Sequence, residues 1–364
     1  MANRYWVPGA NATWNATAGT KWAATSNTAG GASVPTAADD VFFDGVGLGA
    51  FNCTLATGSR PCRSINFTGY TNTFNHTVGT LDIGDGTAGA GSIAIKTVAG
   101  MTYTRGGAVN LISTNGTLQT ITWSNTTSPQ TLTINGAGSD YELGAALTVN
   151  GALTVTQGTF STSSSNYAVT SAGFSSTGTL SRTISLNSST YSVATGTWTI
   201  TGSNVTLNSG TSAISFPVPL PTSSFSGGGL VYNQVTFSSI GAFGANTISI
   251  VGSNTIGTLT FASAVNSGVT VQFAAGSTTT ITNAINFNGV STDTILVVSG
   301  NPGTQYTISK NGALVEATWI ELTDCIGTGE AKYFASNSVN NGNNVNWRFN
   351  APNRGTQSLL GCGI

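Results

Sequence analysis

Residues 145–155 read AALTVNGALTV, a run in which Leu and Val alternate with Thr, Asn or Gly. Alternation with a period of two, rich in β-branched residues, is the pattern of a β-strand with one buried face. Similar runs of four to seven residues extend from INFT at residue 65 to YTISK at residue 306, and Gly, Asn or Ser separates them. No stretch has helical periodicity over three turns, so we predict an all-β protein.

The spacing of these runs indicates a repetitive architecture. They recur every six to twelve residues, and GALTV, GTWTI and GTLTF repeat the same order of residue types. Such repetition is typical of stacked rungs, in which inward apolar residues form ladders while Thr, Ser and Asn face water. We therefore predict a parallel β-helix or β-solenoid. The alternative is two antiparallel β-sandwich domains split near residues 216–229, because Pro217, Pro219 and Pro221 cannot donate to a ladder.

Charge is scarce through the middle of the chain. Between Glu142 and Asp293 the only charged side chain is Arg182. Acid–base catalysis and metal binding both draw on ionisable side chains, so this stretch is predicted to be scaffold. Charges repeated on every rung would lie about 4.8 Å apart and repel one another. The net charge is −1 and the eleven Lys and Arg are scattered, so we expect no nucleic-acid partner.

The first fifty residues have a different composition. Trp6, Trp14 and Trp22 occur at eight-residue spacing and are followed by GGASVPTAADDVFFDG. A loop-rich segment that buries large aromatic residues suits the exposed end of a repetitive β-stack. We therefore predict an N-terminal cap or attachment segment over residues 1–50, leading into a strand at residues 41–43.

The rest of the chain divides into two further predicted parts. The solenoid is expected over residues 51–349, with an interruption at residues 216–229 as one arrangement of the Pro-rich segment. A short C-terminal tail is expected over residues 350–364, where it is available for attachment or for contacts between chains.

Four cysteines admit more than one interpretation. Cys53 and Cys62 flank TLATGSRP, in which Gly58 and Pro61 can reverse the chain and permit a disulfide. The alternative is that all four are reduced thiols, because small buried Cys residues are common. Cys362, near the C-terminus, is a candidate for an interchain disulfide.

No metal or cofactor site is expected. The chain has one histidine and no CxxC pair, and nothing in it resembles a cofactor-binding motif. Asp39 and Asp40 are interpreted as turn residues before a strand rather than as metal ligands, because Asp side chains bond to nearby backbone in turns.

The two ends of the chain resemble a known class of protein. Residues 335–349, ASNSVNNGNNVNWRF, resemble the closing phrase A-x-x-S-V-x-x-G-N-N-x-x-W-x-F of right-handed β-helix proteins encoded by bacteriophages and of some surface adhesins. The opening, with RYWV, the spaced Trp residues and VPTAADDVFFD, is similar to the first coil of phage virion β-helix proteins. The resemblance implies a non-enzymatic virion structural protein, such as a fibre, spike or capsid-decorating element, that forms a trimer and binds other virion proteins.

Localisation follows from the same resemblance. The N-terminal residues lack the basic and apolar regions of an export signal, and no apolar run is long enough to cross a bilayer. We therefore expect no membrane insertion and assembly in the host cytoplasm, which favours a virion component over a secreted adhesin. The alternative function is a host-glycan-binding adhesin or a polysaccharide depolymerase on the same fold.

A depolymerase needs two carboxylates about 5 to 10 Å apart. Asp140 and Glu142, in SDYEL, would share one strand face about 7 Å apart and are the weak catalytic candidates. We favour a structural interpretation of all the acidic pairs, as a solvated strand edge, a Gly-rich turn or part of the closing coil, and expect no active site. The other pairs are Asp82 with Asp85 and Glu321 with Asp324.

Three further side chains have two interpretations each. His76 has no carboxylate near it in sequence and is interpreted as a surface or interface residue rather than a general base. Trp123 and Trp198 lie within strand patterns, as core residues or as sugar-stacking platforms, and the core interpretation is favoured. Thr-x-Thr phrases suggest an ice-binding array, but their irregular intervals argue against it.

Overall fold

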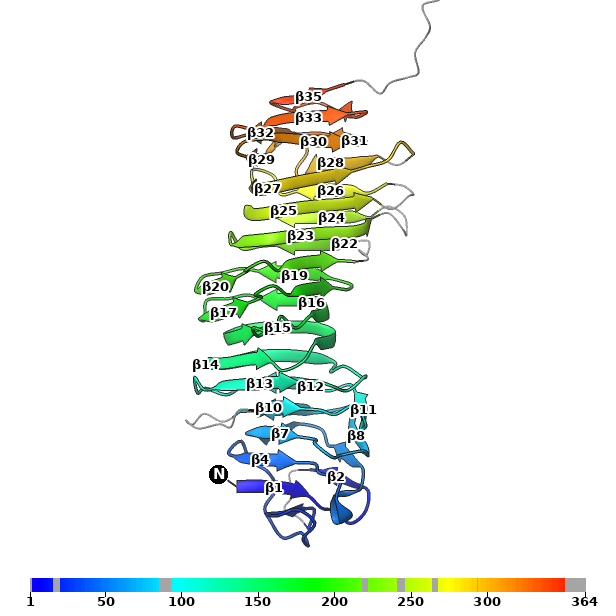
Figure 1. Ribbon diagram of the computed structural model, residues 1–364, viewed down its shortest axis with the longest axis vertical. Coiled ribbons are helices and arrows are strands. Elements are labelled where there is room, and N and C mark those ends of the chain that lie inside the picture. The colour runs from blue at the N-terminus through cyan, green and yellow to red at the C-terminus, as the bar shows by residue number, and fades with distance from the viewer. Residues whose placement is uncertain are drawn as a thin grey trace, which may run out of the picture. The chain divides into compact units, whose positions relative to one another are not determined.

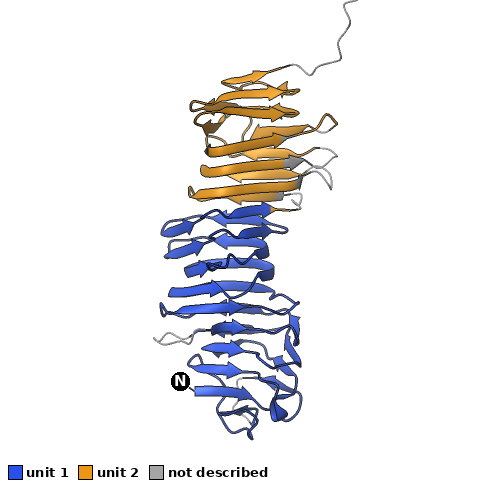
Figure 2. Cartoon of the chain, in the orientation of Figure 1, with its two compact units in different colours: residues 1–215 blue, residues 216–364 orange. Residues whose placement is uncertain are grey.

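The computed structural model describes residues 2–15, 20–84, 93–217, 222–240, 246–263, 268–292 and 294–350. The chain divides into two compact units, Met1–Ser215 and Phe216–Ile364 (Figure 2). The described residues contain no α-helix, one short 3-10 turn, η1 (Gly47–Gly49), and many short strands. The fold is a parallel β-solenoid of about 11 turns, as predicted (Figure 1).

The first unit is built from short strands separated by Gly, Asn and Ser corners. Its strands are β1 (Ala2–Trp6), β2 (Ala12–Trp14), β3 (Trp22–Ala23), β4 (Asp39–Phe42), β5 (Cys53–Leu55), β6 (Ser59–Cys62), β7 (Ser64–Asn66), β8 (Thr73–His76), β9 (Thr80–Ile83), β10 (Ile93–Lys96), β11 (Thr102–Arg105), β12 (Ala108–Leu111), β13 (Leu118–Thr122), β14 (Thr131–Leu143), β15 (Leu147–Ser161), β16 (Val169–Ser176), β17 (Arg182–Ser185), β18 (Thr190–Val193), β19 (Thr197–Ile200), β20 (Val205–Asn208) and β21 (Ala213–Phe216).

The second unit has longer strands in its first coils and shorter ones towards its end. They are β22 (Thr222–Ser226), β23 (Val231–Ile240), β24 (Thr247–Val251), β25 (Asn254–Ser263), β26 (Thr270–Phe273), β27 (Thr278–Asn288), β28 (Ile295–Ser299), β29 (Tyr306–Lys310), β30 (Leu314–Thr318), β31 (Ile320–Leu322), β32 (Cys325–Thr328), β33 (Lys332–Ser336), β34 (Val339–Asn340) and β35 (Trp347–Phe349).

Strands of successive coils pair in parallel and in register. In the first unit, β9, β12, β14, β15, β16 and β19 form one such series. Each strand alternates, so one of its faces is buried along the whole series. The buried residues that lie one over the next are Leu81, Val109, Leu132, Leu153, Phe174 and Trp198.

The second unit repeats this arrangement with aromatic rings. Phe237, Phe261 and Phe287 pair in register through β23, β25 and β27. Their ring centroids are 5.4 and 5.2 Å apart, and the rings are nearly parallel. The ladder continues through Ala317 and Ala335. Each of these side chains is fully buried, so the core of this unit is a stack along the coil direction.

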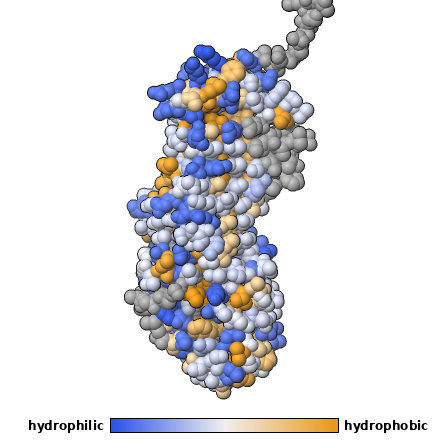
Figure 3. Space-filling model, in the orientation of Figure 1, coloured by the Kyte–Doolittle hydropathy of each residue, from blue (hydrophilic) through white to orange (hydrophobic). Residues whose placement is uncertain are grey.

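The outward positions of the same strands carry neutral polar side chains. Hydrogen bonds join several of them from one coil to the next, as between Asn208 Nδ2 and Ser185 Oγ at 3.0 Å and between Asn286 Nδ2 and Thr260 Oγ1 at 3.0 Å. Figure 3 shows mostly pale, weakly polar residues on the visible face, with hydrophobic residues scattered among them. One outward ladder consists of Asp82, Asn110, Thr133, Thr154, Ser175 and Thr199.

The Trp-rich N-terminal segment closes the start of the stack. Trp22 packs edge-to-face against both Trp6 and Trp14 at 5.1 Å, and Phe43 lies beneath this cluster. Strand β3 pairs antiparallel with β1. Parallel stacking already begins with β1 on β4 and β2 on β5, so residues 1–50 form the first coil as well as its lid.

The closing phrase terminates the last coils with side-chain hydrogen bonds. Ser338 Oγ accepts a bond from the backbone N of Ile320 at 3.1 Å. Asn344 accepts from the backbone N of Cys325 at 2.9 Å and donates to the carbonyl of Leu322 at 2.8 Å. These side chains satisfy backbone groups that a further coil would otherwise pair.

The β-sandwich alternative is wrong, because the strands pair in parallel rather than as antiparallel hairpins. The segment that suggested it does coincide with the boundary between the units, which falls between Ser215 and Phe216. Pro217 follows β21, and the chain returns to strand structure at Thr222. Pro219 and Pro221 lie outside the described residues. None of the described segments is a helix long and apolar enough to span a membrane.

Charge placed on one outward ladder should destabilise the fold cooperatively. The triple variant is Thr133→Glu, Thr154→Glu, Ser175→Glu. We expect its free energy of unfolding to fall by about 1 kcal/mol per neighbouring pair more than the sum of the three single changes, because like charges then lie about 4.8 Å apart. Most of this excess should vanish in 1 M NaCl. Urea unfolding of the single and triple variants measures it.

The matched control is the triple variant Thr133→Glu, Thr154→Lys, Ser175→Glu, in which neighbouring charges attract. This variant should be at least as stable as the sum of its single changes. Additive costs without salt dependence in the all-Glu variant would contradict the stacking argument.

Candidate functional site

The predicted catalytic pair lies on a flat outward face. Asp140 and Glu142 both face outward from β14 and are half-buried. In-register neighbours are Leu118 and Thr120 on one side and hydroxyl side chains of β15 on the other. Burial raises the pKa of Asp140. The two carboxyl groups therefore share a face, as predicted, but none of the described cavities is lined by either of them.

The acids of the closing coil are engaged in structural bonds. Asp324 is buried and accepts bonds from the backbone N of Gly303 at 2.9 Å and from Asn343 Nδ2 at 2.6 Å. Glu321 accepts from Thr294 Oγ1 at 3.0 Å. These carboxylates link neighbouring segments of the last coils, in agreement with the structural interpretation.

The acid of the Gly-rich turn also has structural partners. Asp82 accepts bonds from Ser59 Oγ and from Asn110 Nδ2, the latter at 2.8 Å. It therefore links β6, β9 and β12 on the outward face. Asp85, its partner in the predicted pair, lies outside the described residues.

Asp39 and Asp40 hold the first coil together. Asp39 and Asp40 were predicted to be turn residues before a strand, but both belong to β4; Asp39 Oδ2 does accept bonds from the backbone N and the hydroxyl of Thr36, in the preceding turn, at 2.9 and 2.8 Å. Asp40 instead forms an ion pair with Arg63 and accepts from Ser64 Oγ at 2.6 Å. Neither carboxylate is free to bind a metal ion in this arrangement.

His76 was predicted to be a surface or interface residue, and that prediction is wrong. Its side chain is fully buried in β8, with Nδ1 2.8 Å from the hydroxyl oxygen of Tyr103. A Cβ at Gly107 would overlap Nε2. Burial lowers the pKa of His76 to about 4. The alternation of TFNH places His76 on the same face as Phe74, and this inward position was the signal that sequence reasoning missed.

Trp123 and Trp198 both belong to the core, which was the favoured interpretation. Trp198 is fully buried and stacks on Phe174 with ring centroids 4.2 Å apart. Trp123 is 5% exposed, and its indole N donates to the carbonyl of Thr127 at 3.0 Å. Neither offers an open ring face for a sugar.

The Cys53–Cys62 disulfide is not formed. Cys53 pairs with Phe74 in the small sheet of β2, β5, β8 and β11, whereas Cys62 pairs with Ile83 in the main sheet, and both thiols are free. The chain between them turns a corner of the coil instead of folding back as a hairpin. Burial raises the pKa of both thiols, so neither is a reactive nucleophile. Cys362 lies outside the described residues.

Two arginines that sequence reasoning passed over are buried at coil corners. Arg182 is 1% exposed and donates to Ser176 Oγ at 2.9 Å and to the carbonyls of Leu180 and Thr201 at 2.7 and 3.0 Å. Arg60 is 7% exposed, and its guanidinium group donates to the backbone carbonyls of Trp14, Ser59 and Thr57. For Arg182 the signal was available, because Ile184 two residues later is apolar and shares its strand face.

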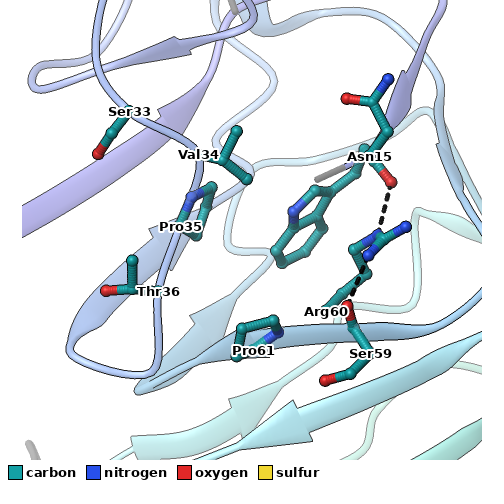
Figure 4. Close-up of a pocket in the computed structure, with 9 residues that line it drawn as sticks. Asn15, Ser33, Val34, Pro35, Thr36, Ser59, Arg60 and Pro61 are labelled. Carbon is teal, nitrogen blue, oxygen red and sulfur yellow. Dashed lines mark hydrogen bonds between the residues drawn. The ribbon is translucent and has the colours of Figure 1, made fainter. Parts of the chain in front are cut away.

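A cavity of about 370 Å³ lies between the N-terminal segment and β6. Figure 4 shows Val34, Pro35 and Thr36 on one side of it and Arg60 and Pro61 on the other. No carboxylate, imidazole or thiol lines it, so the hydroxyl groups of Ser33, Thr36 and Ser59 have no general base among the lining residues. The lining residues are Trp14, Asn15, Ser33, Val34, Pro35, Thr36, Ser59, Arg60 and Pro61.

Within the described residues, no three His, Cys, Asp or Glu side chains come together in a way that would hold a metal ion. No protein-family model matches this chain, and neither does any curated protein or solved structure. The argument for function therefore depends on the fold and on the placement of individual side chains.

The buried histidine should make the fold sensitive to acid. Unfolded His binds a proton near pH 6.5, whereas folded His76 does so only near pH 4, so the unfolded state holds more protons between these values. The contribution of His76 to the free energy of unfolding is therefore greatest above about pH 6.5. It should fall by up to roughly 3 kcal/mol as the pH drops to 4. Urea unfolding at a series of pH values measures the loss.

His76→Gln provides the comparison, because His76 is the only histidine in the chain. The difference in stability between the two proteins should change across this pH window and be constant above it. An unchanged difference would show that His76 titrates normally in the folded protein.

Loss of the Arg182 guanidinium should destabilise the first unit. Lysine cannot reach three separate acceptors, and a buried acceptor left without a donor costs about 1–3 kcal/mol. We expect Arg182→Lys to lower the free energy of unfolding by at least that amount. The control is Arg105→Lys, an exposed position, where the change should be within about 0.5 kcal/mol. Equal effects of the two substitutions would contradict the role of Arg182.

Proposed function

We propose that this chain is a non-enzymatic structural protein of a bacteriophage particle, in which it serves as a fibre, a spike or a capsid-decorating element. The observation that carries the proposal is the in-register stacking within each unit. Inward positions hold apolar ladders, and outward positions hold hydroxyl and amide side chains. A chain of this kind is suited to bear load, because backbone hydrogen bonds run from coil to coil along the stack.

The placement of charge supports a mechanical role. Two ion pairs, Arg4 with Asp39 and Arg63 with Asp40, occur within the described ranges, and both lie in the first coils. The remaining cohesion comes from apolar burial and neutral hydrogen bonds, which salt screens little. Such a protein would keep its structure across the ionic strengths that a free particle meets.

The ends of the chain support the link to phage β-helix proteins. The closing phrase resembles theirs in sequence, and its Ser338 and Asn344 satisfy backbone groups of the last coils. In this proposal the protein is a homotrimer bound to other virion proteins, and it is localised to the virion after assembly in the host cytoplasm. The N-terminal cap or residues 350–364, with Cys362, would provide attachment; residues 351–364 lie outside the described ranges.

A host-glycan-binding adhesin or depolymerase is the second candidate. One observation favours it, since Asp140 has a raised pKa and lies on the same face as Glu142, as an acid and a base would. Cleavage of host polysaccharide by the purified chain, lost in Asp140→Asn, would replace the first proposal with this one.

Immunogold electron microscopy of purified particles tests the proposal, with an antibody to this chain and particles stripped of it as the control. We expect label on the particle. Label over the head indicates decoration or a head fibre, whereas label at the tail indicates host contact. Absence of label from every particle would contradict a virion role.

A further inference from the structure

Six asparagines in this chain are followed directly by glycine, and each pair contains the atoms of a self-modification reaction. The backbone N of the glycine attacks Cγ of the asparagine and closes a five-membered ring, with no Cβ on the glycine to hinder the approach. The attacking N–H and the asparagine side chain must both be free of hydrogen bonds. The six pairs are Asn115–Gly116, Asn135–Gly136, Asn150–Gly151, Asn288–Gly289, Asn311–Gly312 and Asn341–Gly342.

Hydrogen bonds hold the glycine N–H in three of these pairs. A bonded N–H keeps its proton and its direction, so its nitrogen becomes available for attack only when the segment opens locally. The bonds run from Gly151 N to the carbonyl of Gln130 at 2.8 Å, from Gly289 N to the carbonyl of Thr318 at 3.1 Å and from Gly342 N to Asn340 Oδ1 at 3.0 Å.

In two further pairs the asparagine side chain is held. Asn115 is buried, and its Oδ1 accepts a bond from the backbone N of Thr117 at 2.9 Å. Asn135 lies within β14, where its Oδ1 accepts a bond from Gln157 Nε2 at 3.1 Å. Ring closure turns the side chain towards the following backbone N, so these bonds must break before the reaction can proceed.

Asn311 and Gly312, in the turn between β29 and β30, carry neither restraint. Asn311 is exposed, and no described residue forms a hydrogen bond with its side chain or with the backbone N of Gly312. Gly329, in the next coil, leaves room for the amide, since a Cβ there would come within 2.8 Å of Asn311 Oδ1. Both reacting groups of this pair are therefore free.

The backbone on either side of this pair is anchored to the next coil. The carbonyl of Lys310 accepts a bond from the backbone N of Ala331 at 3.1 Å. The carbonyl of Ala313 accepts a bond from the backbone N of Lys332 at 3.4 Å. These bonds fix the two ends of the turn and leave the reacting atoms of Asn311 and Gly312 unbonded.

We propose that Asn311 is a self-modification site that deamidates to aspartate and isoaspartate, with water as the co-reactant. The backbone N of Gly312 gives up its proton to solvent base and bonds to Cγ of Asn311. The Cγ–Nδ2 bond breaks, and ammonia leaves. Water then opens the cyclic imide at one of its two carbonyl carbons. Opening at Cγ gives aspartate, whereas opening at the backbone carbonyl carbon gives isoaspartate, in which the main chain runs through the former side chain.

The two products change the turn in different ways. Both carry a carboxylate where the chain has a neutral amide, so the net charge becomes one unit more negative. Isoaspartate also adds one carbon atom to the backbone between the anchored carbonyls of Lys310 and Ala313, so that one of their two bonds to the next coil must shift. The inference does not depend on a virion role, because it concerns one turn of the second unit alone.

Peptide mapping by mass spectrometry tests the proposal, after the folded full chain has been incubated at a series of mildly acidic to mildly alkaline pH values. We expect the peptide that contains Asn311 to exchange its side-chain NH₂ for OH and to separate into an aspartate form and an isoaspartate form. The rate should rise with pH, because the attacking nitrogen must lose its proton. The other five pairs should react at least roughly tenfold more slowly, since they wait for local opening of the fold.

The same chain unfolded in urea is the matched control. All six pairs then lack the hydrogen bonds of the folded state and should react at similar rates, so selectivity confined to the folded chain is due to its structure. Asn311→Gln should remove the products at position 311 and leave the other five pairs unchanged, because closure on a glutamine side chain requires a six-membered ring. An Asn311 that is unmodified in the folded chain, or that reacts there no faster than the other five asparagines, would overturn the proposal.

Discussion

The structure depends on one constraint, the parallel in-register pairing of each coil with the next. A residue that points inward in one coil must find a residue of compatible shape about 4.8 Å away in the next. Stacked Phe237, Phe261 and Phe287 satisfy this condition in the second unit. The same condition applies on the outer face, where a like charge repeated at that spacing would repel. Hydroxyl and amide side chains stack there without such repulsion, which accounts for the low charge of the chain.

Polar and charged groups that depart from the ladders are found where the stacking changes. Buried Arg182 and Arg60 bind carbonyl groups at coil corners, where the backbone leaves one face for the next. Asp324 and Asn344 bind the segments of the last coils, and the N-terminal lid uses three tryptophans. These groups satisfy the backbone where the stack turns or ends.

Several features of the candidate sites were readable from local sequence, and others were not. The alternation in SDYEL correctly placed Asp140 and Glu142 on one face. The prediction for His76 was wrong because the alternation of TFNH, which places His76 on the inward face with Phe74, was not applied to it; only its hydrogen-bond partner Tyr103, in the next coil, could not be read locally. The disulfide that the spacing of Cys53 and Cys62 permits does not form, because a corner of the coil separates the two residues and places them in two different sheets.

The sequence by itself determined that the chain is all β, which residues point inward, and that the outer faces are nearly uncharged. These properties follow from alternation within single strands, which is a local pattern. Only the tertiary structure decided which residues are neighbours, because the length of a coil varies. Val109 lies on Leu81, 28 residues earlier, whereas Leu153 lies on Leu132, 21 residues earlier. Contacts between coils, such as that of His76 with Tyr103, therefore emerge only once the coils are stacked.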